Sequence, residues 1–126
     1  EEARLQEQAQ LAKFRGRLIE ARELAFWRCF NTAECDKAFA VAQVFIDQQS
    51  DMKIQVATNT IVETYNPQEV GKIGMKVVRS PLKGDEVEVR LVVTCKMSPA
   101  LPRQDCLAKE LNAYEAFLRF MKSRLP

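Results

Sequence analysis

Cysteine is the residue type with the most evident chemistry in this sequence, which contains four cysteines and no histidine. Cys29 and Cys35 form one local pair, and Cys95 and Cys106 form another. An even number of cysteines in local pairs is typical of two disulfides, although four cysteines permit three pairings. Closing loops of this size stabilises a fold by about 2 to 3 kcal/mol per bridge. We therefore expect two disulfides, and with them an oxidising compartment, periplasmic or extracellular.

Free structural cysteines and a zinc site are the alternatives to the disulfides. The spacings Cys-x5-Cys and Cys-x10-Cys lack the close CxxC pairs of zinc knuckles, and no histidine is present to complete a mixed site. The absence of CxxC also removes the usual sulfur pair of thioredoxin-type exchange. We predict no metal and no cofactor.

Nucleophilic and nucleotide chemistry have little support. Ser-His catalysis is excluded by the lack of histidine, and the four serines have no elbow motif. Gly71 and Gly74 precede a strand-like run, whereas a phosphate-binding loop opens a helix. The net charge of +2 is spread along the chain without a basic block, so we expect no nucleic-acid partner.

Carboxylates remain as candidates for general acid/base work. Glu63 could meet Glu86 or Glu88 on one sheet face, as paired carboxylates do in glycosidases. Alternating Glu, Arg and Lys on a strand is, however, typical of a solvated face with cross-strand pairs. We favour the solvated face and predict no catalytic residue.

A polar cluster ends the first strand-like run and supplies most of the candidate binding residues. It is either a recognition surface or the solvent-facing end of an exposed strand, since Thr and Tyr favour strands anyway. The candidates for binding are Thr58, Asn59, Glu63, Tyr65 and Arg90.

Three alternating runs between residues 53 and 96 must position these side chains. Val87, Val89, Leu91, Val93 and Cys95 alternate with mostly polar residues, which is the pattern of a half-buried strand. The second run, 72–78, repeats it, and a short loop at 80–85 makes the two antiparallel neighbours. The first run, 53–65, would exceed about 40 Å if unbroken. We expect a bulge or bend near 57–60.

Three helices complete the prediction. Residues 1–27 form an N-terminal helix whose second half packs on the domain and whose first half projects or pairs, as a partner-binding helix or as a solvated one. Asn31 and Glu34 form a capping box for a helix that runs to about Gln49. A third helix runs from Gln104 with an apolar stripe, after a loop at 97–103.

The predicted fold class is α+β in the order ααβββα. It has a three-stranded antiparallel meander, helices packed on one sheet face, and two disulfides. The N-terminal helix (1–27) precedes a disulfide-bonded α+β domain (28–126). The layout is generically similar to small periplasmic modules of cell-envelope machinery. The chain begins at Glu1 and not Met, so we expect that a signal peptide, a lipoprotein leader or a membrane anchor has been removed.

Two classes of function fit these observations. The first is an exported, non-enzymatic protein-binding or assembly module of the cell envelope, whose partner binds a sheet edge or the N-terminal helix, with a homodimer as one form. The alternative is a small-ligand binder or an enzyme. Its pocket would lie between sheet and helices and use Glu63 and Tyr65, with Thr58 or Arg90.

Overall fold

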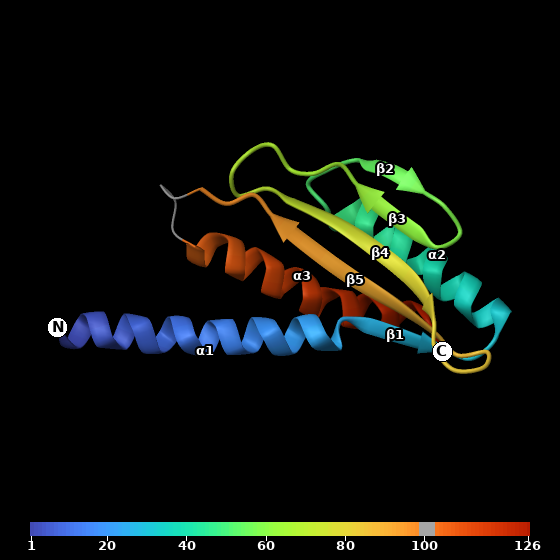
Figure 1. Ribbon diagram of the computed structural model, residues 1–126, viewed down its shortest axis with the longest axis horizontal. Coiled ribbons are helices and arrows are strands. Elements are labelled where there is room, and N and C mark those ends of the chain that lie inside the picture. Colours follow the sequence, from blue (N-terminus) through green and yellow to red (C-terminus); the bar gives the residue numbers. More distant parts are fainter. Residues whose placement is uncertain (99–102) are drawn as a thin grey trace.

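The structure, a computed structural model, describes residues 1–98 and 103–126; part of the predicted 97–103 loop lies outside the described residues. Within the described residues the fold is α+β, as predicted (Figure 1). Its elements are α1 (Glu2–Leu24), β1 (Phe26–Cys29), α2 (Thr32–Gln49), β2 (Ile54–Ala57), β3 (Ile61–Thr64), β4 (Ile73–Pro81), β5 (Val87–Cys95) and α3 (Arg103–Arg124).

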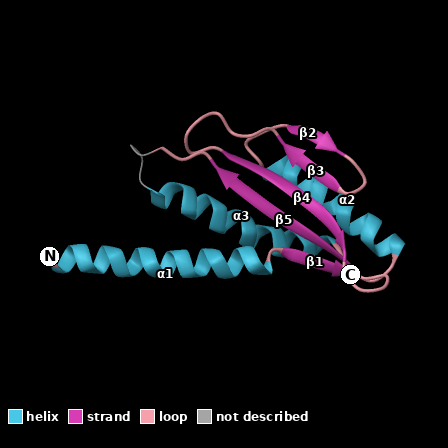
Figure 2. Ribbon diagram, in the orientation of Figure 1, coloured by secondary structure: helices cyan, strands magenta, loops and turns pink. Residues whose placement is uncertain are grey.

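The described strands form one antiparallel sheet in the order β1-β5-β4-β3-β2 (Figure 2). The predicted three-stranded meander is wrong, because the sheet has two more strands. Strands β4 and β5 are the antiparallel neighbours that the alternating runs predicted.

The first additional strand comes from the 53–65 run, which is not one bent strand but a hairpin of β2 and β3. The chain reverses at residues 58–60, where the Thr58 hydroxyl accepts hydrogen bonds from the backbone amides of Thr60 and Ile61. A register shift between Ile54 and Val56 adds the irregularity that was expected slightly later in the run.

The second additional strand is β1, which lies where the N-terminal helix was predicted to continue to Trp27. The helix ends at Leu24 instead, and Phe26 and Trp27 pair with Arg90 and Val89 of β5. Aromatic side chains suit a half-buried strand as well as an apolar helix face, which made the local pattern ambiguous.

Helices α2 and α3 lie on the same side of the sheet, behind it in the view of Figure 1. Between them and the sheet lies the core, in which Phe45 of α2 contacts Phe117 and Phe120 of α3 edge to face, with ring centroids 5.4 Å apart in both pairs. Apolar residues of the two central strands, such as Val77 and Leu91, are buried against this cluster.

Helix α2 begins at the predicted capping box. Asn31 has an extended backbone, and its side-chain oxygen accepts a hydrogen bond from the amide of Glu34 at 2.9 Å. The Glu34 carboxylate in turn accepts a hydrogen bond from the Asn31 side-chain amide. The first bond satisfies one backbone donor that a helix start otherwise leaves free, and the second joins the two side chains.

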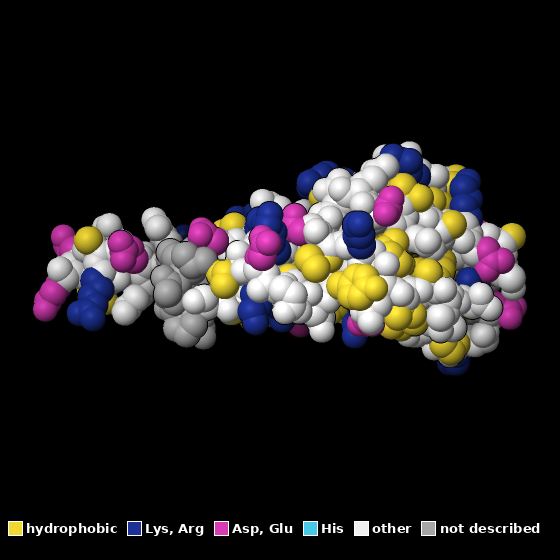
Figure 3. Space-filling view, turned by 90° about the horizontal axis from the view of Figure 1, so that it is seen from above, with side chains coloured by type: hydrophobic (Ala, Val, Ile, Leu, Met, Phe, Trp, Pro, Cys, Tyr) yellow, Lys and Arg dark blue, Asp and Glu magenta, His cyan; other side chains and the backbone are white. Residues whose placement is uncertain are grey.

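Helix α1 packs on α3 through its second half only. Leu18 is buried in the core, and Leu11, Phe14 and Ala21 are partly buried against the core, whereas residues 1–10 are all exposed. The first half therefore projects beyond the rest of the protein, and Figure 3 shows acidic and basic side chains on this projecting end.

Candidate interaction surface

The sheet has a second face that points away from α2 and α3, which we call the outer face. Cross-strand partners share a face, so the register defines it in two rows. One row crosses the sheet as Phe26, Arg90, Val78 and Ile61, and the next as Val92, Lys76, Glu63 and Val56. These side chains are half-buried, and apolar and charged types are intermixed in both rows.

Arg90 and Glu63, two of the predicted binding residues, lie on the outer face but not together. Glu63 stands opposite Lys76 in the register, whereas Arg90 stands opposite Val78 on the far side of β4. Strand β4 therefore lies between Arg90 and Glu63. Lys76, Val78 and Val92 were not selected as binding residues from the sequence. The signal that could have found Val78 was its place in the alternating run, where an apolar residue stands on the face opposite the buried ones.

Arg90 ties the sheet to the end of α1. Its guanidinium donates to the carbonyl oxygens of Arg22 and Glu23 at 3.1 and 3.2 Å, and to the carboxylate of Glu88 at 3.0 and 3.1 Å. It also lies over the Phe26 ring, 5.0 Å from the centroid. The last carbonyls of a helix lack intrahelical donors, so Arg90 serves as a C-terminal cap.

Thr58, Asn59 and Tyr65 lie outside the two rows. Thr58 closes the hairpin turn, and Asn59 is exposed at its tip, beside a surface hollow lined also by Asp36 and Arg79. Tyr65 follows the other end of β3 and is 52% exposed. The five predicted binding residues therefore do not converge on one site.

A shallow depression of about 140 Å³ adjoins the second row, lined by Glu63, Lys76, Val92 and Thr94 among others. Its floor is set by Gly74, where the chain after β3 comes close to β4. A Cβ on Gly74 would stand 3.0 Å from the Thr64 hydroxyl and 3.1 Å from the carbonyl oxygen of Tyr65. Only glycine fits this close approach without a shift of its neighbours.

The edge of β5 beyond β1 is closed by the helices. The backbone amide of Leu91 donates to the carbonyl oxygen of Ala25 at 3.0 Å, and that of Val93 donates to the Tyr114 hydroxyl at 2.9 Å. The amide of Cys95 donates to the carboxylate of Glu110. Every second amide of this edge therefore has a partner from α3 or from the end of α1.

Glu110 is 8% exposed and its carboxylate lies 3.7 Å from the guanidinium of Arg22. Burial raises the pKa of Glu110, and the Arg22 charge and the Cys95 hydrogen bond oppose this rise only in part. Glu110 thus joins α1, α3 and β5 at the cost of keeping a carboxylate away from water.

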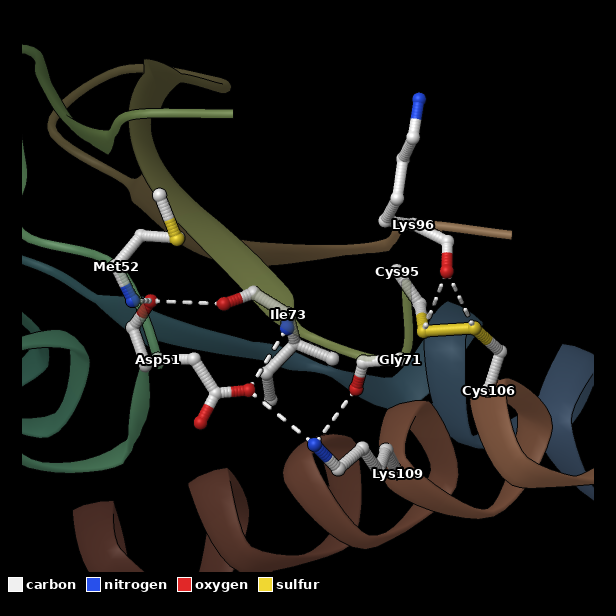
Figure 4. A network of polar contacts seen from close by, with 9 residues as sticks. Asp51, Met52, Gly71, Ile73, Cys95, Lys96, Cys106 and Lys109 are labelled. Carbon is white, nitrogen blue, oxygen red and sulfur yellow. Dashed lines mark hydrogen bonds and ion pairs between the residues drawn. A yellow bond between two sulfur atoms is a disulfide. The ribbon is translucent and has the colours of Figure 1, made fainter. Parts of the chain in front are cut away.

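A second polar junction joins the end of α2 to β4 and α3 (Figure 4). The Asp51 carboxylate accepts a hydrogen bond from the Ile73 amide at 2.8 Å and lies 3.3 Å from the Lys109 ammonium, which also donates to the Gly71 carbonyl at 2.7 Å. Burial alone would raise the pKa of Asp51, but the Ile73 amide and Lys109 together hold it below its ordinary value. The geometry is that of a structural link.

Both predicted disulfides are present, Cys29–Cys35 and Cys95–Cys106. The first joins β1 to the first turn of α2, and the second joins the end of β5 to α3, beside the Asp51 junction in Figure 4. They are compatible with an oxidising compartment.

Across 1–98 and 103–126, no group of three or more Cys, Asp or Glu side chains is arranged to hold a metal ion. None of the helices in the described part of the chain combines the length and apolar character of a membrane span.

No family model matches the sequence, and comparisons with curated proteins and with solved structures found no match.

Proposed function

We propose that this protein is an exported, non-enzymatic module of the cell envelope that binds another protein through the outer face of its sheet. The observation that carries the proposal is the make-up of this face. It combines half-buried Phe26, Ile61, Val78 and Val92 with charges of both signs, and no described element covers it. Protein interfaces commonly surround apolar contacts with a polar rim.

The face is a better binding surface than the sheet edges. The β5 edge is closed by Ala25, Tyr114 and Glu110. The β2 edge has four residues and an irregular register, and short or bulged edge strands oppose the addition of another strand. A partner therefore gains more from the outer face, where five strands present side chains together.

The non-enzymatic part of the proposal rests on the roles of the polar groups. Arg90 caps α1, Thr58 closes a turn, and Asp51 and Glu110 link elements. Glu63 points away from the helices and Tyr65 is largely exposed, so the alternative of a pocket between sheet and helices has less support.

The exported part rests on the two disulfides. Thiol alkylation under denaturing conditions, with and without prior reduction, followed by intact-mass measurement on protein from its own cell, tests it. We expect four cysteines that react only after reduction. Four cysteines that react without reduction would place the protein in a reducing compartment and contradict export.

Binding is tested by site-specific photo-crosslinking. A photoreactive residue replaces Val78 on the outer face and, as a matched control, Val44, which is 40% exposed on α2. Each variant is irradiated in an envelope extract of the source organism. We expect a discrete cross-linked band for the Val78 variant alone, weakened by the additional change Lys76→Glu. Equal bands from both variants, or none from either, would contradict binding through this face.

A further inference from the structure

Helix α1 has a second apolar face that its own domain does not use. Leu11, Phe14 and Leu18 contact the core, whereas Leu5 and Ile19 are 64% and 53% exposed. At 3.6 residues per turn, these two exposed side chains lie about 80° to 180° around the helix from the packed ones, on average about a third of a turn. Neither is among the apolar residues packed against the core.

The exposed face has regular heptad spacing. Leu5, Ala9, Ala12, Gly16 and Ile19 follow one another at steps of four and three, and all five are exposed. This alternation is that of the contact positions in a coiled coil. We call these five residues the exposed stripe; its centre is formed by small side chains, which permit a close approach of two helices.

Nothing within one copy of the chain requires glycine at position 16. Its φ angle is that of an ordinary helix, and a Cβ built on it meets nothing within 4 Å. Glycine in a helix interior costs about 1 kcal/mol relative to alanine. The cost is explained if another side chain packs directly on the helix backbone at this position.

The charges of α1 are divided between its two halves. Residues 1–10 contain Glu1, Glu2 and Glu7 against Arg4, a side-chain charge of −2, whereas 11–24 contain Lys13, Arg15, Arg17 and Arg22 against Glu20 and Glu23, a charge of +2. Two α1 helices that run antiparallel bring each acidic half beside a basic half. Parallel helices bring like halves together.

We propose that two copies of the chain associate through the exposed stripe, with their α1 helices antiparallel. In this arrangement Leu5 of one copy packs on Gly16 of the other, Ala9 packs against Ala12, and Ile19 lies at the level of Glu2. A parallel pair would instead place Gly16 against Gly16 and Glu2 against Glu2. The stripe is separate from the outer face, so the dimer does not depend on the proposed binding function.

The expected dimer is weak. From Leu5 to Ile19 the helix rises only about 21 Å, and its central contacts are small. The pairing alone therefore covers less than the ~1,600 Å² of a standard-size protein interface. Association is expected to depend on protein concentration and to weaken as salt rises, since unlike charges contribute to it.

Sedimentation velocity over a wide concentration range tests the pairing. We expect a reversible monomer–dimer equilibrium for the unaltered chain, and a monomer throughout for Leu5→Glu and for Ile19→Glu. Gln10→Glu is the matched control, because Gln10 is exposed on the same helix but lies outside the stripe; it should dimerise like the unaltered chain. A chain that stays monomeric, or a dimer that survives both stripe changes, would overturn the proposal.

The direction of the helices is tested by cross-linking with a short bis-maleimide. Antiparallel packing brings Gln8 beside Arg15 of the other copy, so mixing Gln8→Cys with Arg15→Cys should give a cross-linked pair. Parallel packing brings Gln8 beside Lys13 instead. A product from Gln8→Cys with Lys13→Cys, without one from the first mixture, would refute the antiparallel arrangement.

Discussion

Arg90 of β5 donates a hydrogen bond through Nη1 to the backbone carbonyl oxygen of Arg22, 3.1 Å away at the end of α1. The two residues are 68 positions apart, so this contact connects the N-terminal helix to the centre of the sheet. Together with the ion pair of Arg22 and Glu110, it fixes where the helix ends and where the chain enters β1. This junction and the packing of Leu18 in the core together orient the projecting half of α1.

The first prediction concerns Arg90. Arg90→Ala should lower the free energy of unfolding by about 1 to 3 kcal/mol, because two helix carbonyls and the Glu88 carboxylate lose a charged donor. Arg90→Lys should recover little of this, since one ammonium cannot reproduce the planar fork. The measurement is denaturant unfolding.

Arg28→Ala is the matched control for Arg90. Arg28 lies on β1 and also faces the outer side of the sheet. Its guanidinium lies 3.3 Å from the Glu86 carboxylate, but its side chain is 56% exposed. Exposed ion pairs contribute at most about 1 kcal/mol. Equal losses for the two variants would show that Arg90 acts as an ordinary surface charge.

The second prediction concerns the Cys95–Cys106 bridge, which closes the loop that enters α3. Cys95→Ser and Cys106→Ser should each lower the melting temperature by several degrees, corresponding to about 2 to 3 kcal/mol. The double variant should resemble the single ones, because the bridge is lost only once. Unchanged melting temperatures in both single variants would remove the bridge as a source of stability.

Local patterns in the sequence were sufficient to predict the presence of the helices, the α+β class and the two cysteine pairs, but not where the first helix ends. The capping box at Asn31 and the alternation in β5 are properties of neighbouring residues, and the structure confirms both. The strand β1 was missed because Phe26 and Trp27 continue the apolar content of α1, and only pairing with β5 decides their conformation.

The roles of the candidate site residues depend on contacts that are distant in the sequence. The turn at Thr58 contains neither glycine nor proline, so the hairpin appeared as a bend. Arg90 was chosen as a polar residue on a strand, yet its partners are helix carbonyls that no local spacing indicates. Charge alternation predicted a solvated face, but not which of its residues stand opposite one another.

The third prediction concerns Gly74. Gly74→Ala should destabilise the protein by about 1 to 3 kcal/mol, because the new methyl group meets Thr64 and the Tyr65 carbonyl at 3.0 and 3.1 Å. The Thr64 hydroxyl has little freedom to move, since it accepts a hydrogen bond from the Met75 amide. Gly16→Ala, measured at a concentration where the chain is monomeric, is the control and should stabilise by up to about 1 kcal/mol.

The fourth prediction concerns Glu110, whose pKa is raised by burial. A raised pKa means that ionisation of Glu110 opposes folding and lowers the free energy of unfolding. This loss of stability is absent below the ordinary carboxyl pKa of about 4.3 and develops as pH rises through the folded-state pKa. Glu110→Gln keeps an acceptor for the Cys95 amide without the charge. It should therefore be more stable than the unaltered protein at pH 7, and this gain should shrink towards pH 4. A loss of stability at pH 7 would contradict the cost of burial.

The last prediction concerns Asp51, whose pKa is lowered, so that its pH dependence has the opposite sign. The stability that it contributes is present above the ordinary carboxyl pKa of about 3.9 and is lost as pH falls through the lower, folded-state pKa. Asp51→Asn should therefore be destabilising at pH 7, where the Lys109 ammonium loses its counter-charge, and less so in acid. Thermal unfolding from pH 7 to 3 measures the difference. Because Asp51 and Glu110 sit in the same protein at separate junctions, their two profiles should slope in opposite directions, and parallel slopes would mean that the electrostatic environment of at least one carboxylate is misassigned.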